Sequence, residues 1–173
     1  GYTVAVVTST FNMSLGVGVL LGTIIGTVIS FGLSFILFRM RGMYFAIATW
    51  VVAEALCVWF KSWKFVNMGG GMTISAKPYP KTPAIYLMAL TVCVVSLIVV
   101  YVLLRTKTGL GLTAMRDDTD AASSVGVNIF KSKLLGYVIA ALFCSLAGAV
   151  FFINKGTIYP DSGFDIGWTV AVV

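Results

Sequence analysis

Long apolar runs separated by short polar breaks dominate this sequence and restrict how the chain can fold. Five runs cover residues 1–11, 14–38, 43–60, 84–104 and 134–153, and a sixth begins near residue 164. The hydrocarbon core of a bilayer is about 30 Å thick, which a helix of roughly 20 apolar residues crosses. Spanning backbone must satisfy its own hydrogen bonds, and these runs are too long for barrel strands. The runs therefore predict an all-α, polytopic membrane helix bundle with at least five to six spanning segments.

The composition agrees with this prediction and excludes several chemistries. Hydrophobic residues make up 59% of the 173 residues and charged residues only 10%. No histidine is present, which excludes Ser-His and Cys-His catalysis and His-ligated metals. Cys57, Cys93 and Cys144 stand singly in different runs without metal-ligand spacing, so we expect small buried apolar residues. The chain starts at Gly1 without a basic n-region and ends within an apolar run, which we interpret as a fragment of a larger protein.

The net charge of +6 indicates topology rather than nucleic-acid binding, because no basic helix or RNA-binding motif accompanies it. The basic residues can be counted separately for the loops on each side of the membrane. One side carries seven basic residues: Arg39, Arg41, Arg105, Lys107, Arg116, Lys131 and Lys133. The other side carries five: Lys61, Lys64, Lys77, Lys81 and Lys155. The positive-inside rule then places the segment "RMRG", residues 39–42, and the loop at 105–133 in the cytoplasm. We expect residues 1–173 to belong to one transmembrane domain.

Small residues recur every four positions in the run 14–38. The series is Ser14, Gly18, Gly22, Gly26, Ser30 and Ser34. Such spacing leaves one helix face nearly bare, so a neighbouring helix backbone can approach closely. We therefore predict helix packing through Gly18, Gly22 and Gly26. A substrate or gating role for this face stays open.

The acidic patch "MRDDTDAASSVG", residues 115–126, predicts a short helix over about 118–126 between two spans. Asp117 or Asp118 can cap its start, and Asp120 suits the positive end of the helix dipole. Gly126 is suited to stop it, because glycine adopts the left-handed conformation at little cost.

Three interpretations of this patch stay open. Ala121, Ala122 and Val125 on the helix surface, framed by carboxylates and Arg116, form an apolar knob that suits docking into a groove on another protein. The patch is alternatively an ordinary solvated loop. A magnesium site is the third interpretation, although no second acidic cluster accompanies the patch, because the other acids are isolated: Glu54, Asp161 and Asp165.

Glu54 is the one acidic residue well inside a predicted span, where charges usually face the bundle interior or a water-filled path. It is a candidate for the translocation path, or it packs or pairs, for example with Lys61. Tyr44 fits an interfacial aromatic position and is also a candidate path residue. The glycine-rich loop after this span is either a plain connector or a contact for a substrate carboxylate or another protein. It contains Gly69, Gly70 and Gly71.

Several segments resemble one family. "TDAASSVGVN" is similar to the cytoplasmic EAA-type signature of bacterial ABC importer permeases. "TGLGLTAMRDD", "FKSKLLGYVIAALFCSLAGAVF", "RMRGMYFAIATWVVAE", "MGGGMT" and "GTIYPDSGFDIGWTVAVV" resemble the branched-chain amino acid permeases of the LivM and LivH type, closest to LivM. The resemblance covers nearly the whole chain. Two departures are Asp120 in place of the usual Glu and the lack of a Leu-Pro shortly after Gly126.

The resemblance implies a permease fragment, multi-pass in the bacterial inner membrane. It implies a homologous permease partner, two cytoplasmic ATPase subunits and a periplasmic binding protein. It also implies a coupling role for the residues that match the signature: Arg116, Asp117, Asp118, Asp120, Ala121, Ala122 and Gly126. We expect no cofactor in this chain, with ATP and magnesium bound by the partner, because no G-x-x-x-x-G-K-[ST] loop is present. Alternatives are a urea or short-amide permease, a secondary transporter or channel, and an Asp-metal membrane enzyme.

Overall fold

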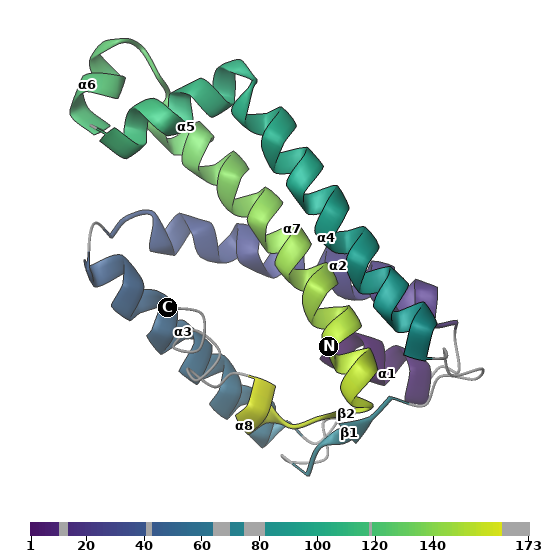
Figure 1. The fold of residues 1–173 in the computed structure, drawn as a ribbon. Coiled ribbons are helices and arrows are strands. Elements are labelled where there is room, and N and C mark those ends of the chain that lie inside the picture. Colours follow the sequence, from purple (N-terminus) through teal and green to yellow (C-terminus); the bar gives the residue numbers. More distant parts are fainter. Residues whose placement is uncertain (11–13, 41–42, 64–69, 75–81, 118, 164–173) are drawn as a thin grey trace.

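The structure is a computed structural model that describes residues 1–10, 14–40, 43–63, 70–74, 82–117 and 119–163. Within these ranges the chain forms helices and one pair of short strands (Figure 1). The helices are α1 (Tyr2–Thr10), α2 (Leu15–Leu37), α3 (Met43–Ser62), α4 (Thr82–Leu104), α5 (Lys107–Asp117), α6 (Thr119–Ser124), α7 (Ile129–Lys155) and α8 (Pro160–Gly163). The strands are β1 (Met72–Thr73) and β2 (Thr157–Ile158).

Four of the described helices, α2, α3, α4 and α7, are long and apolar enough to cross a membrane. They coincide with four of the predicted runs, so the prediction of an all-α polytopic membrane bundle is confirmed. The first run forms α1, which has nine residues in this sequence. The sixth run, from residue 164, lies outside the described residues. The described residues therefore contain four candidate spans.

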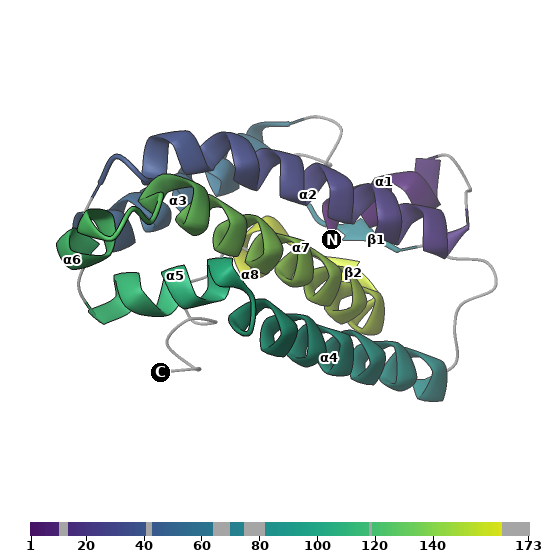
Figure 2. The same cartoon turned by 90° about the horizontal axis from the view of Figure 1, so that it is seen from above.

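Helix α7 lies between α2 and α4 and packs against both, whereas α3 diverges from α4 and α7 (Figures 1 and 2). The C-terminal part of α3 contacts α8. The main buried cluster sits where α1, the start of α4, the end of α7 and the strands meet. It comprises Val4, Ala5, Ile74, Ile85, Ala149, Val150, Ile153 and Ile158. Outside this cluster, many large apolar side chains of α2, α3, α4 and α7 are exposed, as expected of helices in a bilayer.

The strands β1 and β2 form a small antiparallel pair at the same end as this cluster. Met72 pairs with Ile158 and Thr73 with Thr157. The Ile74 amide also donates a hydrogen bond of 2.9 Å to the carbonyl of Gly156, which ends α7 with a φ of +69°. The pair joins the segment before α4 to the end of α7. The sequence did not predict it, because two-residue strands show no alternating pattern.

The opposite end of the bundle carries α5 and α6, next to the end of α2 (Figure 2). The sequence predicted one short helix between the spans, but the structure adds α5 before it. Helix α7 also begins at Ile129 instead of near residue 134, because Asn128 caps it: the Asn128 side chain accepts a hydrogen bond from the Lys131 amide at 3.1 Å. Which end faces the cytoplasm stays a prediction.

Candidate functional site

The candidate site is the helical segment that connects α4 to α7. It begins with a sharp reversal at Thr106, whose Oγ1 accepts a hydrogen bond of 3.3 Å from the amide of Gly109 and so caps α5. A Cβ on Gly109 would lie 2.5 Å from the Cα of Leu104, closer than real contacts allow. Glycine is therefore required here for α5 to fold back tightly against the end of α4.

Helix α6 ends in a Schellman arrangement. The amide of Val127 donates to the carbonyl of Ala122 at 3.1 Å, and the amide of Gly126 donates to that of Ser123 at 3.0 Å. Gly126 has a φ of +89°, and a Cβ there would meet nothing within 4 Å. The glycine is thus needed for its backbone conformation and not for space. Helix α6 itself ends at Ser124, and Gly126, where the sequence analysis expected the stop, forms the turn that closes the helix.

The two faces of α6 differ in exposure. Ala122 is only 4% exposed and Met115 of α5 only 7%, whereas Val125 is 85% exposed. The sequence analysis placed Ala122 on the surface of a docking knob, and this prediction was wrong. Helix α5, which was not expected, packs against α6, the helix in which Ala122 is buried. Of the two described knob residues, Val125 alone faces outward.

The other predicted coupling residues lie around this turn. Arg116 is exposed in the last turn of α5, and Asp117 is the last residue of that helix. The backbone places Asp120 and Ala121 in α6. Asp118, and the side chains of Asp117, Asp120 and Ala121, lie outside the described part of the chain.

The predicted path residues do not form one site among the described residues. Glu54 is exposed midway along α3, and Tyr44, in the first turn of α3, is 74% exposed. Gly70 lies in an exposed turn, and Gly69 lies outside the described residues. Gly71 has a structural use, because its φ is +80° and a Cβ there would lie 2.5 Å from the Tyr159 ring. It thus allows β1 to start close to the segment that follows β2.

The three glycines predicted to pack in α2, Gly18, Gly22 and Gly26, lie at helix contacts. Cβ atoms on Gly18 and Gly22 would lie 3.5 and 3.4 Å from methyl groups of Val4 in α1. A Cβ on Gly26 would lie 3.1 Å from the Cβ of Ser145 in α7 and would collide with its hydroxyl oxygen. One helix face thus receives α1 near its start and α7 near its middle.

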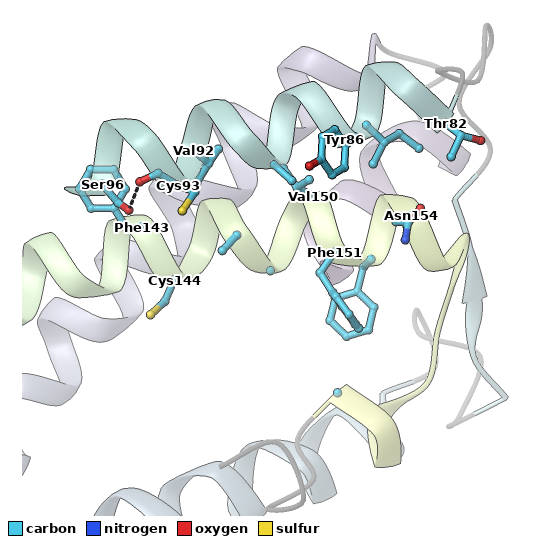
Figure 3. Close-up of a pocket in the computed structure, with 16 residues that line it drawn as sticks. Thr82, Tyr86, Val92, Cys93, Ser96, Phe143, Cys144, Val150, Phe151 and Asn154 are labelled. Carbon is cyan, nitrogen blue, oxygen red and sulfur yellow. Dashed lines mark hydrogen bonds between the residues drawn. The ribbon is translucent and has the colours of Figure 1, made fainter. Parts of the chain in front are cut away.

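A groove of about 920 Å³ lies between α4 and α7, with Gly163 of α8 at its border (Figure 3). Its walls are mostly apolar, and its polar side chains include Thr82, Ser96 and Asn154. The predicted path residues that the structure describes, Glu54, Tyr44, Gly70 and Gly71, do not line it. The sequence contains one pattern that could have indicated this groove: small residues spaced three or four apart on both helices. They are Ala89, Cys93 and Ser96 in α4 and Cys144, Ala147 and Gly148 in α7.

The three cysteines were all expected to be buried, and the structure bears this out for one of them. Cys57 is buried and its Sγ lies 3.7 Å from the carbonyl oxygen of Pro160, as expected of a small core residue. Cys93 and Cys144 are exposed and line the groove, so the prediction that they are buried was wrong. They face the open space between two helices, which periodicity in a single apolar run does not reveal.

Four apolar spans, with a compact two-helix unit between two of them, define a polytopic helical membrane protein. The chain belongs to the family described as "Branched-chain amino acid transport system / permease component", whose profile matches residues 1–173. This confirms the family predicted from the signature and flanking segments, and identifies the chain as part of a membrane permease rather than an enzyme.

Curated relatives match about half of the chain. The chain is 35% identical over 85 residues to the high-affinity branched-chain amino acid transport system permease protein LivM of Salmonella typhimurium and, over the same length, to that of Escherichia coli. These matches span 49% of this chain and 20% of each relative. The fructose import permease protein FrcC of Rhizobium meliloti is 34% identical over 82 residues, or 47% of this chain and 22% of that protein. No solved structure matches the chain.

Proposed function

We propose that the chain forms part of the permease subunit of an ATP-driven ABC importer for branched-chain or related hydrophobic amino acids. The observation that carries this proposal is the α5–α6 unit between α4 and α7, in a chain that matches the permease family along its whole length. The unit exposes the apolar side chain of Val125 in the turn that directly follows α6, whereas Ala122 of α6 is buried. A short structured protrusion of this kind is suited to a groove on a partner.

In this proposal two cytoplasmic ATPase subunits bind ATP and magnesium and receive α6. Their closure moves α6, and the attached spans change between inward-open and outward-open states. A homologous permease subunit and a periplasmic binding protein complete the importer in the bacterial inner membrane. The sequence contains no G-x-x-x-x-G-K-[ST] loop, which agrees with nucleotide binding by a partner.

The relatives support two substrate classes. The two LivM proteins are named for branched-chain amino acids, and FrcC is named for fructose. The groove between α4 and α7 favours the first class, because its walls are mostly apolar and suit an aliphatic side chain. A sugar, urea or a short amide is the alternative cargo.

Reconstitution of the full-length protein with its ATPase subunits and binding protein in liposomes tests this function. With ATP available to the ATPase subunits, we expect uptake of leucine, isoleucine or valine to exceed uptake of fructose and urea. Uptake that proceeds without ATP, or without any bound ATPase subunit, would contradict the importer. Preferential uptake of fructose or urea would leave the assignment as an importer in place but would change the proposed substrate class.

A further inference from the structure

Helix α5 lies against two small residues near the start of α7. A Cβ on Gly136 would lie 3.7 Å from both methyl groups of Leu112, so the Leu112 side chain sits directly over this glycine. One turn earlier, Ser132 is 8% exposed, and its hydroxyl lies 3.7 Å from the Cβ position of Gly111. Ser132 and Gly136 are four residues apart and therefore share one face of α7. Together they form a small-residue notch, into which the Gly111–Leu112 segment of α5 fits.

The same segment of α5 is also connected to α6. A Cβ on Gly111 would lie 3.1 Å from a methyl group of Val127, the residue whose amide closes the end of α6 on Ala122. Ala122 and Met115 are buried. A continuous series of packed contacts thus runs from α6 through α5 to the notch on α7.

Helix α7, which carries the notch near its start, runs without interruption for 27 residues from Ile129 to Lys155. Midway, its Ser145 packs against Gly26 of α2, and at its far end Gly156 leads directly into β2. A displacement of the start of α7 is therefore transmitted to α2 and to the strand pair, because a packed helix moves as a rigid body.

From this series of contacts we infer that Leu112 and the notch formed by Ser132 and Gly136 are the positioning residues that transmit movement of α6 to α7. The inference rests on the proposed function, because it specifies how the energy of ATP hydrolysis reaches the spans. Leu112 contacts neither substrate nor nucleotide in this scheme. It acts by keeping α5 and α7 in fixed register.

The inference is tested in the full-length, assembled transporter by making the side chain at position 112 smaller and the side chain at position 136 larger, singly and together. Leu112→Ala removes the contact, and Gly136→Leu forces α5 away from α7. Each variant is expected to lower the ratio of substrate transported to ATP hydrolysed by about fivefold or more, the range of ordinary coupling energies. The ATPase subunits are expected to remain bound, because Val125 is unaltered. The double variant Leu112→Ala/Gly136→Leu returns the lost volume and is expected to recover most of the ratio.

Two variants serve as matched controls. Gly136→Ala is expected to behave like the wild type, since 3.7 Å is an ordinary van der Waals distance for the added methyl group. Leu110→Ala removes a leucine from the same helix that is 66% exposed, and is expected to leave the ratio unchanged.

An unchanged ratio in both Leu112→Ala and Gly136→Leu would overturn the inference while leaving the proposed function in place, provided that the ATPase co-purifies. The inference would also be overturned if the double variant had the same low ratio of transport to ATP hydrolysis as the single variants. The cause would then be a disrupted structure and not the poor fit between Leu112 and Gly136. Failure of the wild-type protein to bind an ATPase would instead contradict the proposed function.

Discussion

Ser145 of α7 occupies the space that a side chain on Gly26 of α2 would need. The added Cβ would lie 3.1 Å from the Cβ of Ser145 and would collide with its hydroxyl oxygen. Lipid provides no hydrophobic drive between helices, so this close approach supplies van der Waals contact instead. The relationship joins the two helices that form the most closely packed pair of spans.

Gly26→Leu is expected to separate α2 from α7 and to destabilise the folded protein by about 1–3 kcal/mol, the usual cost of overpacking. Gly32→Leu in the same helix is the matched control, because a Cβ at Gly32 meets nothing within 4 Å. Thermal unfolding of both variants in the same detergent checks this prediction. Equal midpoints for the two variants would contradict the packing of α2 on α7.

Gly126 offers a test of backbone conformation alone. Its φ of +89° disfavours residues with a Cβ, and the surrounding space is open, so a substitution changes only the local strain. Gly126→Ala is expected to destabilise the end of α6 by about 1 kcal/mol, whereas Gly126→Asn is expected to cost less, because asparagine tolerates the left-handed region. The effect is measured by hydrogen exchange of the backbone amides at positions 126 and 127 in the wild type and in both variants. Equal exchange in the two variants would rule out strain as the reason for this glycine.

Ala122 and Val125 test the two faces of α6. Ala122→Glu buries a charge next to α5 and is expected to open the α5–α6 unit, since an unpaired buried charge costs several kcal/mol. Val125→Glu adds the same group to an exposed position and is expected to leave the unit folded. Both variants are expected to lose the ATPase on purification, but limited proteolysis should cleave the 105–128 segment faster in Ala122→Glu alone. Equal cleavage would indicate that Ala122 is not buried.

Glu54 remains a prediction for the translocation path. Its side chain is exposed on α3, in the part of the chain that diverges from α4 and α7. If the carboxylate contacts the substrate amino group, Glu54→Gln should raise the KM for uptake by about tenfold, a loss of 1.4 kcal/mol in binding. Glu54→Asp is the control that keeps the charge. Unchanged uptake by Glu54→Gln would remove Glu54 from the path.

Much of the membrane architecture could be predicted from sequence because it depends on local composition. The runs that became α2, α3, α4 and α7 are set by length and hydropathy alone. Helix α5 was missed because it contains Gly109 and Gly111, each of which costs a helix about 1 kcal/mol relative to alanine. Its stability comes from contacts with α4 and α7, which the local sequence does not show.

The candidate site also has some features that could be predicted from the local sequence and others that could not. The stop of α6 at Gly126 could be predicted, because the Schellman arrangement involves only residues 122–127. The burial of Ala122 could not, since it depends on α5 folding back beneath α6. The groove between α4 and α7 likewise requires two helices that are separated in sequence by residues 105–128.

Site-directed cross-linking at Val125 tests the central claim most directly. In a full-length variant with Cys57, Cys93 and Cys144 replaced by serine, Val125→Cys is labelled with a photoactivatable thiol reagent in membranes that contain the ATPase subunits. The control is Thr73→Cys, an exposed position on β1 at the other end of the bundle. The account predicts an ATPase adduct with Val125→Cys whose yield changes when ATP is added, and none with Thr73→Cys. No adduct with Val125→Cys, or equal adducts with both variants, would contradict the assignment of α6 as the site that receives the ATPase.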